Sequence, residues 1–317
     1  MKPKEVNIDD IIAPLPREII KSELNSTCFV RKANNGNNEI YIVNDNLAPN
    51  TLREIGRLRE ISFRQAGGGT GKDCDLDEFD FGTHSYQQLI VWDPVEQEIV
   101  GGYRFIRCSD AEKDEKGYPK LATSELFHFS PLFVANYLQH TIELGRSFVQ
   151  PQYQPSIDNR KGIFSLDNLW DGLGAITVDN PDIQYFFGKV TMYPHFNREA
   201  RDLILRFMLH FFPDTEKLVV PIYTVVPSNQ SASFLDEIEG MNYKEAHKLL
   251  SQKVRNSGEH VPPLVNAYMN LSPTMKMFGT AINEHFGEVE ETGIMVKIAD
   301  IYPAKKERHV STYHPKV

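Results

Sequence analysis

The chain has 317 residues, of which 41% are hydrophobic and 24% charged, a composition typical of a soluble globular protein with one large or two small domains. The formal net charge of −9, without a basic block, argues against a general nucleic-acid-binding protein. Three cysteines that lie far apart exclude a zinc ribbon or a disulfide scaffold. The first residues lack the apolar core of a signal peptide, so we expect a cytoplasmic protein.

The first half of the chain predicts two helices and several strands. A helix is expected over 17–23 and a longer one over 50–65, where apolar residues recur at helical spacing. An Asn/Gly-rich turn over 34–37 predicts a hairpin. The expected strands cover 27–31, 39–43, 86–92, 99–107, 122–127 and 141–149.

The second half predicts helices and strands around a helical insertion. Asn197 is expected to cap an amphipathic helix that stops at Pro213, and Asn242 with Glu245 forms a capping-box pattern at the start of another helix. The other expected elements are a helix over 163–176, strands over 185–192, 218–226 and 292–301, and a basic tail. This order predicts an α/β (α+β) protein with a mixed sheet.

Changes in composition divide the chain into four expected parts. Residues 1–48 should form an N-terminal extension with a hairpin, and residues 49–226 should form the main core. Residues 227–271 predict a helical insertion or cap near the C-terminus. Residues 272–317 should return to the core with a final helix, a strand and the basic tail.

A glycine-rich segment, GGGTGK over 67–72, follows the expected 50–65 helix. The phosphate-binding loop pattern would require glycine in place of Ala66 and serine or threonine in place of Asp73. That pattern also follows a strand, whereas this segment follows a helix. We therefore interpret it as a flexible loop over an active site and not as a nucleotide site.

An acidic segment over 73–80 comes next in the chain. An EF-hand loop that starts at Asp73 would need glycine where Glu78 stands and glutamate where His84 stands, so this calcium-binding pattern is excluded. From composition alone the segment is as well explained by a solvated acidic turn as by a functional motif.

Two further segments combine charge with glycine. In the ELGR segment over 143–146, Glu143 and Arg146 would face opposite sides of a regular strand unless a bulge intervenes. Alone, the segment is a charge pair in a sheet. Asn159-Arg160-Lys161-Gly162 opens an expected helix, whose N–H groups and two cations suit a phosphate, although a solvated helix start has the same composition.

Four short motifs then occur in a fixed order. They are R-x-x-x-F with Arg59 and Phe63, D-x-x-D with Asp77 and Asp80, G-x-x-R with Arg104, and E-x-x-R with Glu143 and Arg146. The series resembles the amino-acid-acylating branch of the GNAT-type acyltransferases. That branch includes ornithine-lipid and glycine-lipid N-acyltransferases (also labelled hemolysins), N-acyl amino acid synthases and, more distantly, acyl-homoserine-lactone synthases. The resemblance covers roughly residues 50–302, and residues 273–296 look like the family's last helix and strand.

The resemblance implies a mixed sheet splayed around an acyl-pantetheine cleft, with no metal and no tightly bound cofactor. The donor would be a long-chain acyl group, such as a 3-hydroxyacyl group, on acyl carrier protein or CoA. The acceptor would be a small amino acid such as glycine or ornithine, and the product an aminolipid. An amine that attacks a thioester must give up a proton, so Glu143 is expected as the acid/base or amine-positioning group.

The same resemblance assigns the other motif residues to the site. Arg104 and Arg146 are expected either to bind the acceptor's carboxylate or to hold the aspartates in an ion-pair network. The remaining expected residues are His84 as a weaker base, Arg59, Phe63, Asp77 and Asp80 at the substrate, and Arg160, Lys161 and Gly162 at the pantetheine phosphate.

Two alternative enzymes and one non-enzymatic function compete with this hypothesis. Lactone synthases usually carry a tryptophan where this chain has Gly67-Gly68-Gly69, which argues against lactone synthesis. An acyl-CoA-dependent acetyltransferase would share the fold but not the carrier protein. A membrane-active hemolysin or lipid-binding protein would not need Glu143, and a peripheral contact with the inner membrane face is compatible with all of these functions.

The negative net charge restricts where an acyl carrier protein could bind. Carrier proteins are strongly acidic, so the cations of a −9 protein should be concentrated at one surface. The expected docking cations are Arg160, Lys161, Arg198, Arg201 and Arg206.

Overall fold

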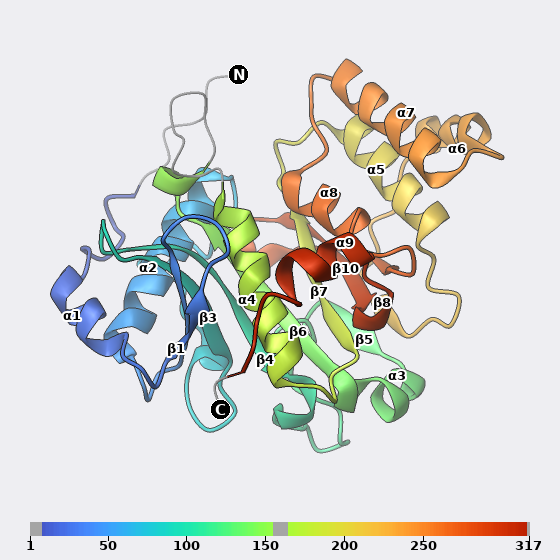
Figure 1. Ribbon diagram of the computed structural model, residues 1–317. Helices are drawn as coiled ribbons and strands as arrows, with labels where there is room; N and C mark the ends of the chain where they lie inside the picture. The colour runs from blue at the N-terminus through green and yellow to red at the C-terminus, as the bar shows by residue number, and fades with distance from the viewer. Residues whose placement is uncertain (1–7, 155–163, 316–317) are drawn as a thin grey trace. The chain divides into compact units, whose positions relative to one another are not determined.

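The structure is a computed structural model that describes residues 8–154 and 164–315. Its fold divides into two compact units. The first contains the described parts of 1–122, 139–184 and 303–317, and the second contains 123–138 and 185–302. Both units combine antiparallel strands with helices (Figure 1), so the expected α/β character is confirmed.

The first unit contains five strands that pair in an antiparallel manner in the order β1, β2, β3, β4, β6. The β1–β2 hairpin expected near the N-terminus pairs with β3 and is therefore part of this sheet. The strands are β1 (Phe29–Lys32), β2 (Glu39–Val43), β3 (Gln87–Asp93), β4 (Glu98–Arg107) and β6 (Thr141–Val149), and the helices are α1 (Arg17–Glu23), α2 (Pro49–Gln65), α4 (Ser165–Asp179) and α9 (Pro303–His309).

Helices α2 and α4 cover opposite faces of this sheet. Side chains alternate along β3, so Gln88 and Leu89 point to different faces. Gln88 accepts a hydrogen bond from Arg59 of α2. A Cβ atom on Gly172 of α4 would lie 2.6 Å from Leu89. The two faces therefore present different chemistry, with buried charged groups under α2 and close apolar packing under α4.

Helix α9 packs against α4 in the first unit. His309 shares a hydrogen bond of 2.7 Å with Asp171, and the carboxylate of Asp171 also accepts the N–H of Asn34 at 2.8 Å. Gly174 permits this approach, because a Cβ atom there would lie 2.1 Å from the carbonyl oxygen of His309. The basic tail expected from the sequence thus contains a helix.

We expect Gly174→Ala to destabilise the protein by about 1–3 kcal/mol, because the added methyl group would meet backbone that cannot easily move. The same substitution at an exposed helix position stabilises by about 1 kcal/mol, so the two effects differ in sign. Urea unfolding followed by circular dichroism would measure the change. A Gly174→Ala protein as stable as wild type, or more so, would show that α9 does not pack this closely on α4.

The second unit contains strands in the order β7, β10, β9 and a separate β5–β8 pair. Phe129, Phe133, Phe187 and Phe278 form an aromatic cluster with ring centroids 5.3–5.8 Å apart. The strands are β5 (Phe127–Phe129), β7 (Tyr185–Met192), β8 (Val219–Pro221), β9 (Lys276–Asn283) and β10 (Val289–Lys297), and the helices are α3 (Pro131–Asn136), α5 (Arg198–Phe211), α6 (Ser233–Ile238), α7 (Tyr243–Asn256) and α8 (Pro263–Met269).

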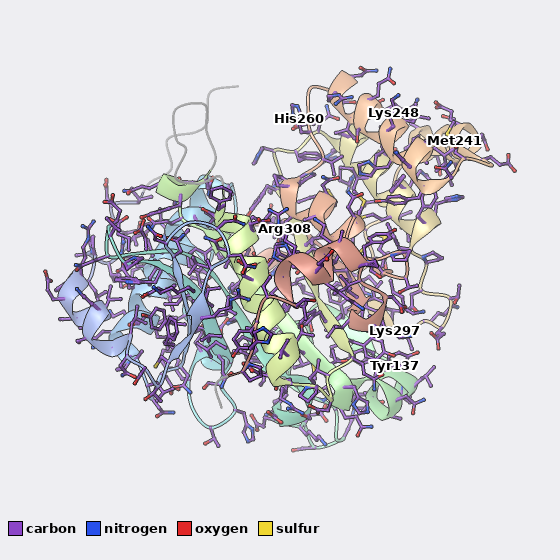
Figure 2. All side chains as sticks on the ribbon, in the orientation of Figure 1. Tyr137, Met241, Lys248, His260, Lys297 and Arg308 are labelled. Atoms are coloured by element: carbon purple, nitrogen blue, oxygen red, sulfur yellow. The ribbon has the colours of Figure 1, made fainter. Side chains whose placement is uncertain are left out.

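The region 227–271 is helical, as expected, and consists mainly of α6, α7 and α8. Asn242 and Glu245 form the capping box at the start of α7, with reciprocal hydrogen bonds of 3.1 Å. Ala246, Leu250 and Val254 are buried on one side of α7, which packs against α5. Met241, Lys248 and His260 of the insertion are exposed (Figure 2).

Three expected elements in the second unit were wrong, and a fourth was displaced along the chain. The strand expected over 122–127 is mostly a turn, and only residues from Phe127 onward form β5. The strand expected over 218–226 is shortened to the three residues of β8. The segment compared with the family's last helix contains β9, because it pairs along its length with β10. The strand expected over 292–301 begins and ends earlier, as β10.

Candidate active site

Six charged residues of the first unit form one buried cluster. We call it the arginine–aspartate cluster, and its members are Arg59, Asp75, Asp77, Asp80, Arg104 and Arg146. Asp80, which is 0% exposed, lies 3.2 Å from both Arg59 and Arg104. Arg104 also lies 2.7 Å from Asp77. Arg146 completes the cluster at 3.0 Å from Asp75 and 3.6 Å from Asp77.

The D-x-x-D spacing has a local cause. Asp77 is the N-cap of a short 3₁₀ helix, Glu78–Asp80, and its side chain accepts the N–H of Phe79 at 3.1 Å. The carboxylate of Asp80 turns back to accept the N–H of Asp77, also at 3.1 Å. The turn therefore fixes the orientation of two carboxylates that lie three residues apart, and both form ion pairs with arginines of the cluster.

A β-bulge places Arg146 in the cluster. The β4–β6 ladder pairs Arg104 with Gly145 but Gly102 with Phe148, so β6 contains one extra residue at this point. Arg146 adopts a positive φ of 48°, which is uncommon for residues other than glycine. Arg146 shares Asp77 with Arg104, so the bulge has brought it to the α2 face of the sheet.

Glu143 lies in β6 and is 1% exposed. Its carboxylate accepts a hydrogen bond from the hydroxyl of Tyr86, and that hydroxyl accepts the N–H of Ala122 at 2.9 Å. The guanidinium of Arg104 lies 5.1 Å from the centre of the Tyr86 ring. Tyr86 therefore joins Glu143 to the arginine–aspartate cluster.

The charges of the cluster favour the ionised form of Asp77. Burial opposes the ionisation of Asp77, but the charge and hydrogen bond of Arg104, followed by the charge of Arg146, lower its pKa to about 2. For Arg104, burial is outweighed by Asp80 and Asp77, which raise its pKa. For Arg59, burial prevails and lowers the pKa. Of the two roles expected for Arg104 and Arg146, the structure displays the ion-pair network.

Tyr86 and Asp75 were missed as site residues from the sequence. Tyr86 carried one usable signal, because strand alternation places it on the same face as Gln88 and therefore near Arg104, which pairs with Gln88. Asp75 lies in the acidic segment but two residues before the D-x-x-D motif. Phe63 is buried in α2, one turn after Arg59, as R-x-x-x-F spacing requires.

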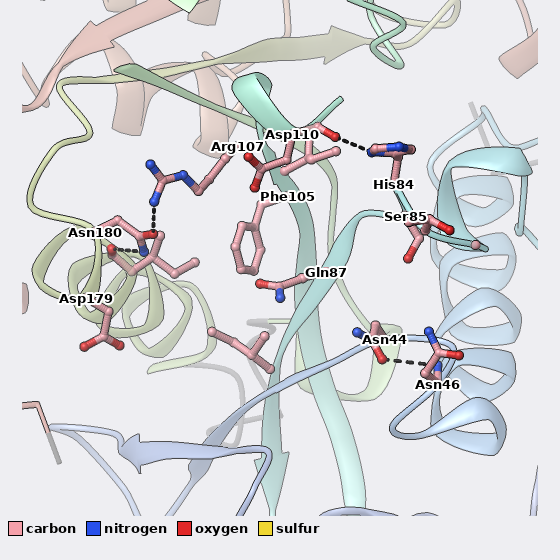
Figure 3. Close-up of a pocket in the computed structure, with 15 residues that line it drawn as sticks. Asn44, Asn46, His84, Ser85, Gln87, Phe105, Arg107, Asp110, Asp179 and Asn180 are labelled. Carbon is pink, nitrogen blue, oxygen red and sulfur yellow. Dashed lines mark hydrogen bonds between the residues drawn. The ribbon is translucent and has the colours of Figure 1, made fainter. Parts of the chain in front are cut away.

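His84 is not brought together with Glu143. Its Nδ1 atom lies 2.6 Å from the carbonyl oxygen of Asp110 at the edge of a cavity of about 1080 Å³ (Figure 3). Gln87 and Phe105, which line this cavity, alternate with Gln88 and Arg104, so they belong to the α4 face of the sheet. No member of the arginine–aspartate cluster lines it.

The glycine-rich loop is held in place by a buried carboxylate. Glu60, 0% exposed, accepts the hydroxyl of Thr70 at 2.7 Å and the N–H groups of Thr70 and Gly71 at 3.0 and 2.8 Å. These bonds anchor one end of the segment, and a flexible loop over the active site stays a prediction. Arg160, Lys161 and Gly162 lie outside the described residues. Within 8–154 and 164–315, no group of three or more histidine, cysteine or acidic side chains is arranged to hold a metal ion.

The part of the chain that contains this site matches a known protein family. Residues 58–157 match the family model described as an acetyltransferase (GNAT) domain, a range that contains Glu143, Tyr86 and the whole arginine–aspartate cluster. The chain is 51% identical to a glycine N(alpha)-acyltransferase of Bacteroides thetaiotaomicron, with 97% of this chain and 92% of the relative covered. It is 48% identical to a glycine N(alpha)-acyltransferase of Phocaeicola vulgatus, with 97% and 95% covered. This chain belongs to the GNAT acyltransferase family.

A more distant relative is the L-ornithine N(alpha)-acyltransferase of Brucella abortus, which is 27% identical and aligns with 80% of this acyltransferase and 83% of its own length. The chain matches no solved structure. The expected family and GNAT-type fold are thus confirmed. None of the helices in the described part of this acyltransferase has the length and apolar character that a bilayer crossing requires.

Two of the arginines expected to dock a carrier protein are bound within the second unit. Arg201 lies 2.6 Å from Glu290 and 2.7 Å from Asp202. Arg206 donates to the hydroxyl of Ser231 and the carbonyl oxygen of Ser228, both at 2.6 Å. The contacts of Arg206 tie helix α5 to the start of the insertion. Arg198 is exposed, and Arg160 and Lys161 lie outside the described residues, so docking of a carrier protein stays a prediction for these three.

Asp77 should make the stability of this acyltransferase depend on acidity. Because its pKa is lowered to about 2 in the folded state, its contribution is fully present above the ordinary value of 3.8 and is lost as the pH falls toward 2. The difference in unfolding free energy between wild type and Asp77→Asn should shrink by on the order of 2 kcal/mol over this window. Urea unfolding at about pH 6 and about pH 2.5 would measure it, and a difference independent of pH would contradict the ion-pair assignment.

Proposed function

We propose that this acyltransferase moves a long-chain acyl group from a phosphopantetheine thioester on acyl carrier protein to the amine of glycine. The main support is the near-50% identity, over almost the whole chain, to two glycine N(alpha)-acyltransferases. A further support is the buried carboxylate of Glu143, which Tyr86 links to the arginine–aspartate cluster and which is the kind of group that such acid/base chemistry needs. The product is an N-acylglycine, an aminolipid or its precursor.

Glu143 is proposed as the general base, acting directly or through one water. Amine attack on a thioester forms a C–N bond and breaks the C–S bond, and the amine loses a proton as the pantetheine thiolate leaves. Only the ionised carboxylate of Glu143 can accept that proton, and the protonated acid can then deliver it to the leaving sulfur. Negative charge develops on the thioester oxygen and needs N–H donors, a role that we assign to the backbone at the bulge in β6.

Arg146 is proposed to bind the carboxylate of the acceptor amino acid. Both arginines are shared between two aspartates, but the side chain of Arg146 is 13% exposed and that of Arg104 only 3%, so Arg146 is the more accessible of the two. A guanidinium that is already oriented by Asp75 can bind a small carboxylate without further ordering. Arg59, Asp77 and Asp80 then act by fixing this orientation. Arg160, Lys161 and Gly162 remain the proposed contacts of the pantetheine phosphate.

The proposal is tested by offering the purified protein separate donors and acceptors. Palmitoyl or 3-hydroxypalmitoyl carrier protein should react faster than the matching acyl-CoA, and glycine faster than ornithine or serine. Mass spectrometry of the N-acyl product and release of free thiol would follow the reaction. Faster transfer to ornithine would show that glycine is not the preferred acceptor. Faster transfer from acyl-CoA would show that the carrier protein is not the preferred donor. No product from any pair would overturn the proposal.

A further inference from the structure

We infer that Tyr86 is a positioning residue, which holds the carboxylate of Glu143 in one orientation and in its ionised form and ties it to the arginine–aspartate cluster. Nothing in the four sequence motifs points to this residue. The inference rests on the proposed role of Glu143 in acyl transfer. It concerns a group that acts on the base and not on the substrate.

The hydrogen-bond partners of Tyr86 determine the direction of its proton. Tyr86 is 1% exposed and lies directly before β3. The N–H of Ala122 can only donate, so the phenolic oxygen accepts that bond. The single hydroxyl proton is then available for Glu143, whose Oε2 atom accepts it. The two bonds fix the orientation of the hydroxyl group, so that its proton points at the carboxylate of Glu143.

The ring of Tyr86 is fixed from two other sides. The guanidinium of Arg104 lies over it, 5.1 Å from its centre. The ring of Phe79 meets it edge-on, with centroids 5.7 Å apart. Phe79 belongs to the 3₁₀ turn that carries Asp77 and Asp80, so the same turn supports both the arginines and the tyrosine. A shift of that turn would therefore move the donor of Glu143.

The charged and titratable groups around this pair favour a protonated phenol. Burial and the charge of Glu143 raise the pKa of Tyr86 far above its ordinary value, and the nearby Arg104 only partly opposes this. Burial, followed by the charge of Glu143, also raises the pKa of Cys108, so this thiol stays neutral. Tyr86 thus donates to the carboxylate throughout the working pH range and does not itself compete for the substrate's proton.

Loss of the hydroxyl should change the pH dependence of the reaction more than substrate binding. A buried carboxylate that loses a donor is harder to ionise, because the charged form depends on such bonds more than the neutral form does. Loss of a hydrogen bond to a charged group shifts an ionisation by about 1–2 pH units. The acid limb of kcat/KM should therefore move to higher pH.

The test is Tyr86→Phe, which keeps the ring and its contacts with Arg104 and Phe79. For N-acylglycine formation we expect the acid limb to move up by about 1 pH unit, kcat near neutrality to fall about tenfold, and KM for glycine to change less than twofold. In a Glu143→Gln background the same change should have no further effect. The matched control is Tyr41→Phe, because Tyr41 is also buried and donates to a carboxylate, that of Glu39 at 2.7 Å.

Each outcome bears on a separate claim. Active Tyr86→Phe protein with an unshifted pH profile, or with a raised KM alone, would overturn the positioning role. An inactive wild type would instead overturn the proposed function. If Tyr86→Phe does not fold, 3-fluorotyrosine at position 86 keeps the hydroxyl and makes it a stronger donor. The acid limb should then move to lower pH, and an unchanged limb would again contradict the inference.

Discussion

Glu143→Gln is expected to lower kcat for N-acylglycine formation by about 10²–10⁴-fold, the usual contribution of a positioned general base. Glutamine has nearly the same shape and can still accept the hydroxyl proton of Tyr86, so the fold should be retained. It cannot take a proton from the amine. The effect should fall on kcat, while the KM for the acyl donor stays close to the wild-type value.

The matched control for this variant is Glu39→Gln. Glu39 also accepts a tyrosine hydroxyl, that of Tyr41 at 2.7 Å, but it lies in β2, away from the arginine–aspartate cluster. We expect it to leave kcat within about twofold of wild type. A Glu143→Gln enzyme that keeps more than a tenth of wild-type activity across the pH range would show that another group accepts the proton.

Asp80→Asn should reduce the free energy of unfolding by about 3–5 kcal/mol, the cost of breaking a buried ion pair by removing one partner. Asp80 is 0% exposed and is shared by Arg59 and Arg104. When Asp80 loses its charge, Arg59 loses the carboxylate that pairs with it and keeps the amide oxygen of Gln88 as a hydrogen-bond partner. Since folded proteins are stable by only about 5–15 kcal/mol, this is a large fraction.

The exposed pair Arg107–Asp182 offers the control for this prediction. The side chains of Arg107 and Asp182 are 34% and 50% exposed, so water already solvates both charges. We expect Asp182→Asn to cost less than about 1 kcal/mol. Urea unfolding of both variants would measure the contrast. Equal effects of the two substitutions would contradict the view that the cluster is held together by buried charge.

The site motifs could be recognised in the sequence because their spacing has local causes. R-x-x-x-F follows the turn of a helix, and D-x-x-D follows the capping box that Asp77 and Asp80 form. The E-x-x-R motif required more, because Arg146 reaches the cluster only through a bulge with a positive φ. The spacing of the motif indicates that a bulge would be needed, but only the structure shows that the bulge is present.

Tyr86 could not be found in this way, because its partners are set by tertiary structure. The bond to Glu143 joins residues that lie 57 positions apart, and it depends on the register of β3 against β4 and of β4 against β6. The short strands β5 and β8 were misjudged for a related reason. Each has three residues and is defined by pairing with the other and not by its own pattern.

The most direct test is the lipid content of cells that produce this protein. Wild type and Glu143→Gln, expressed to the same level, would be compared with cells that carry an empty vector, using mass spectrometry of extracted lipids. The account predicts long-chain N-acylglycine in cells with the wild type and only the vector level in cells with Glu143→Gln. Wild-type cells without N-acylglycine, or equal amounts with both proteins, would contradict it.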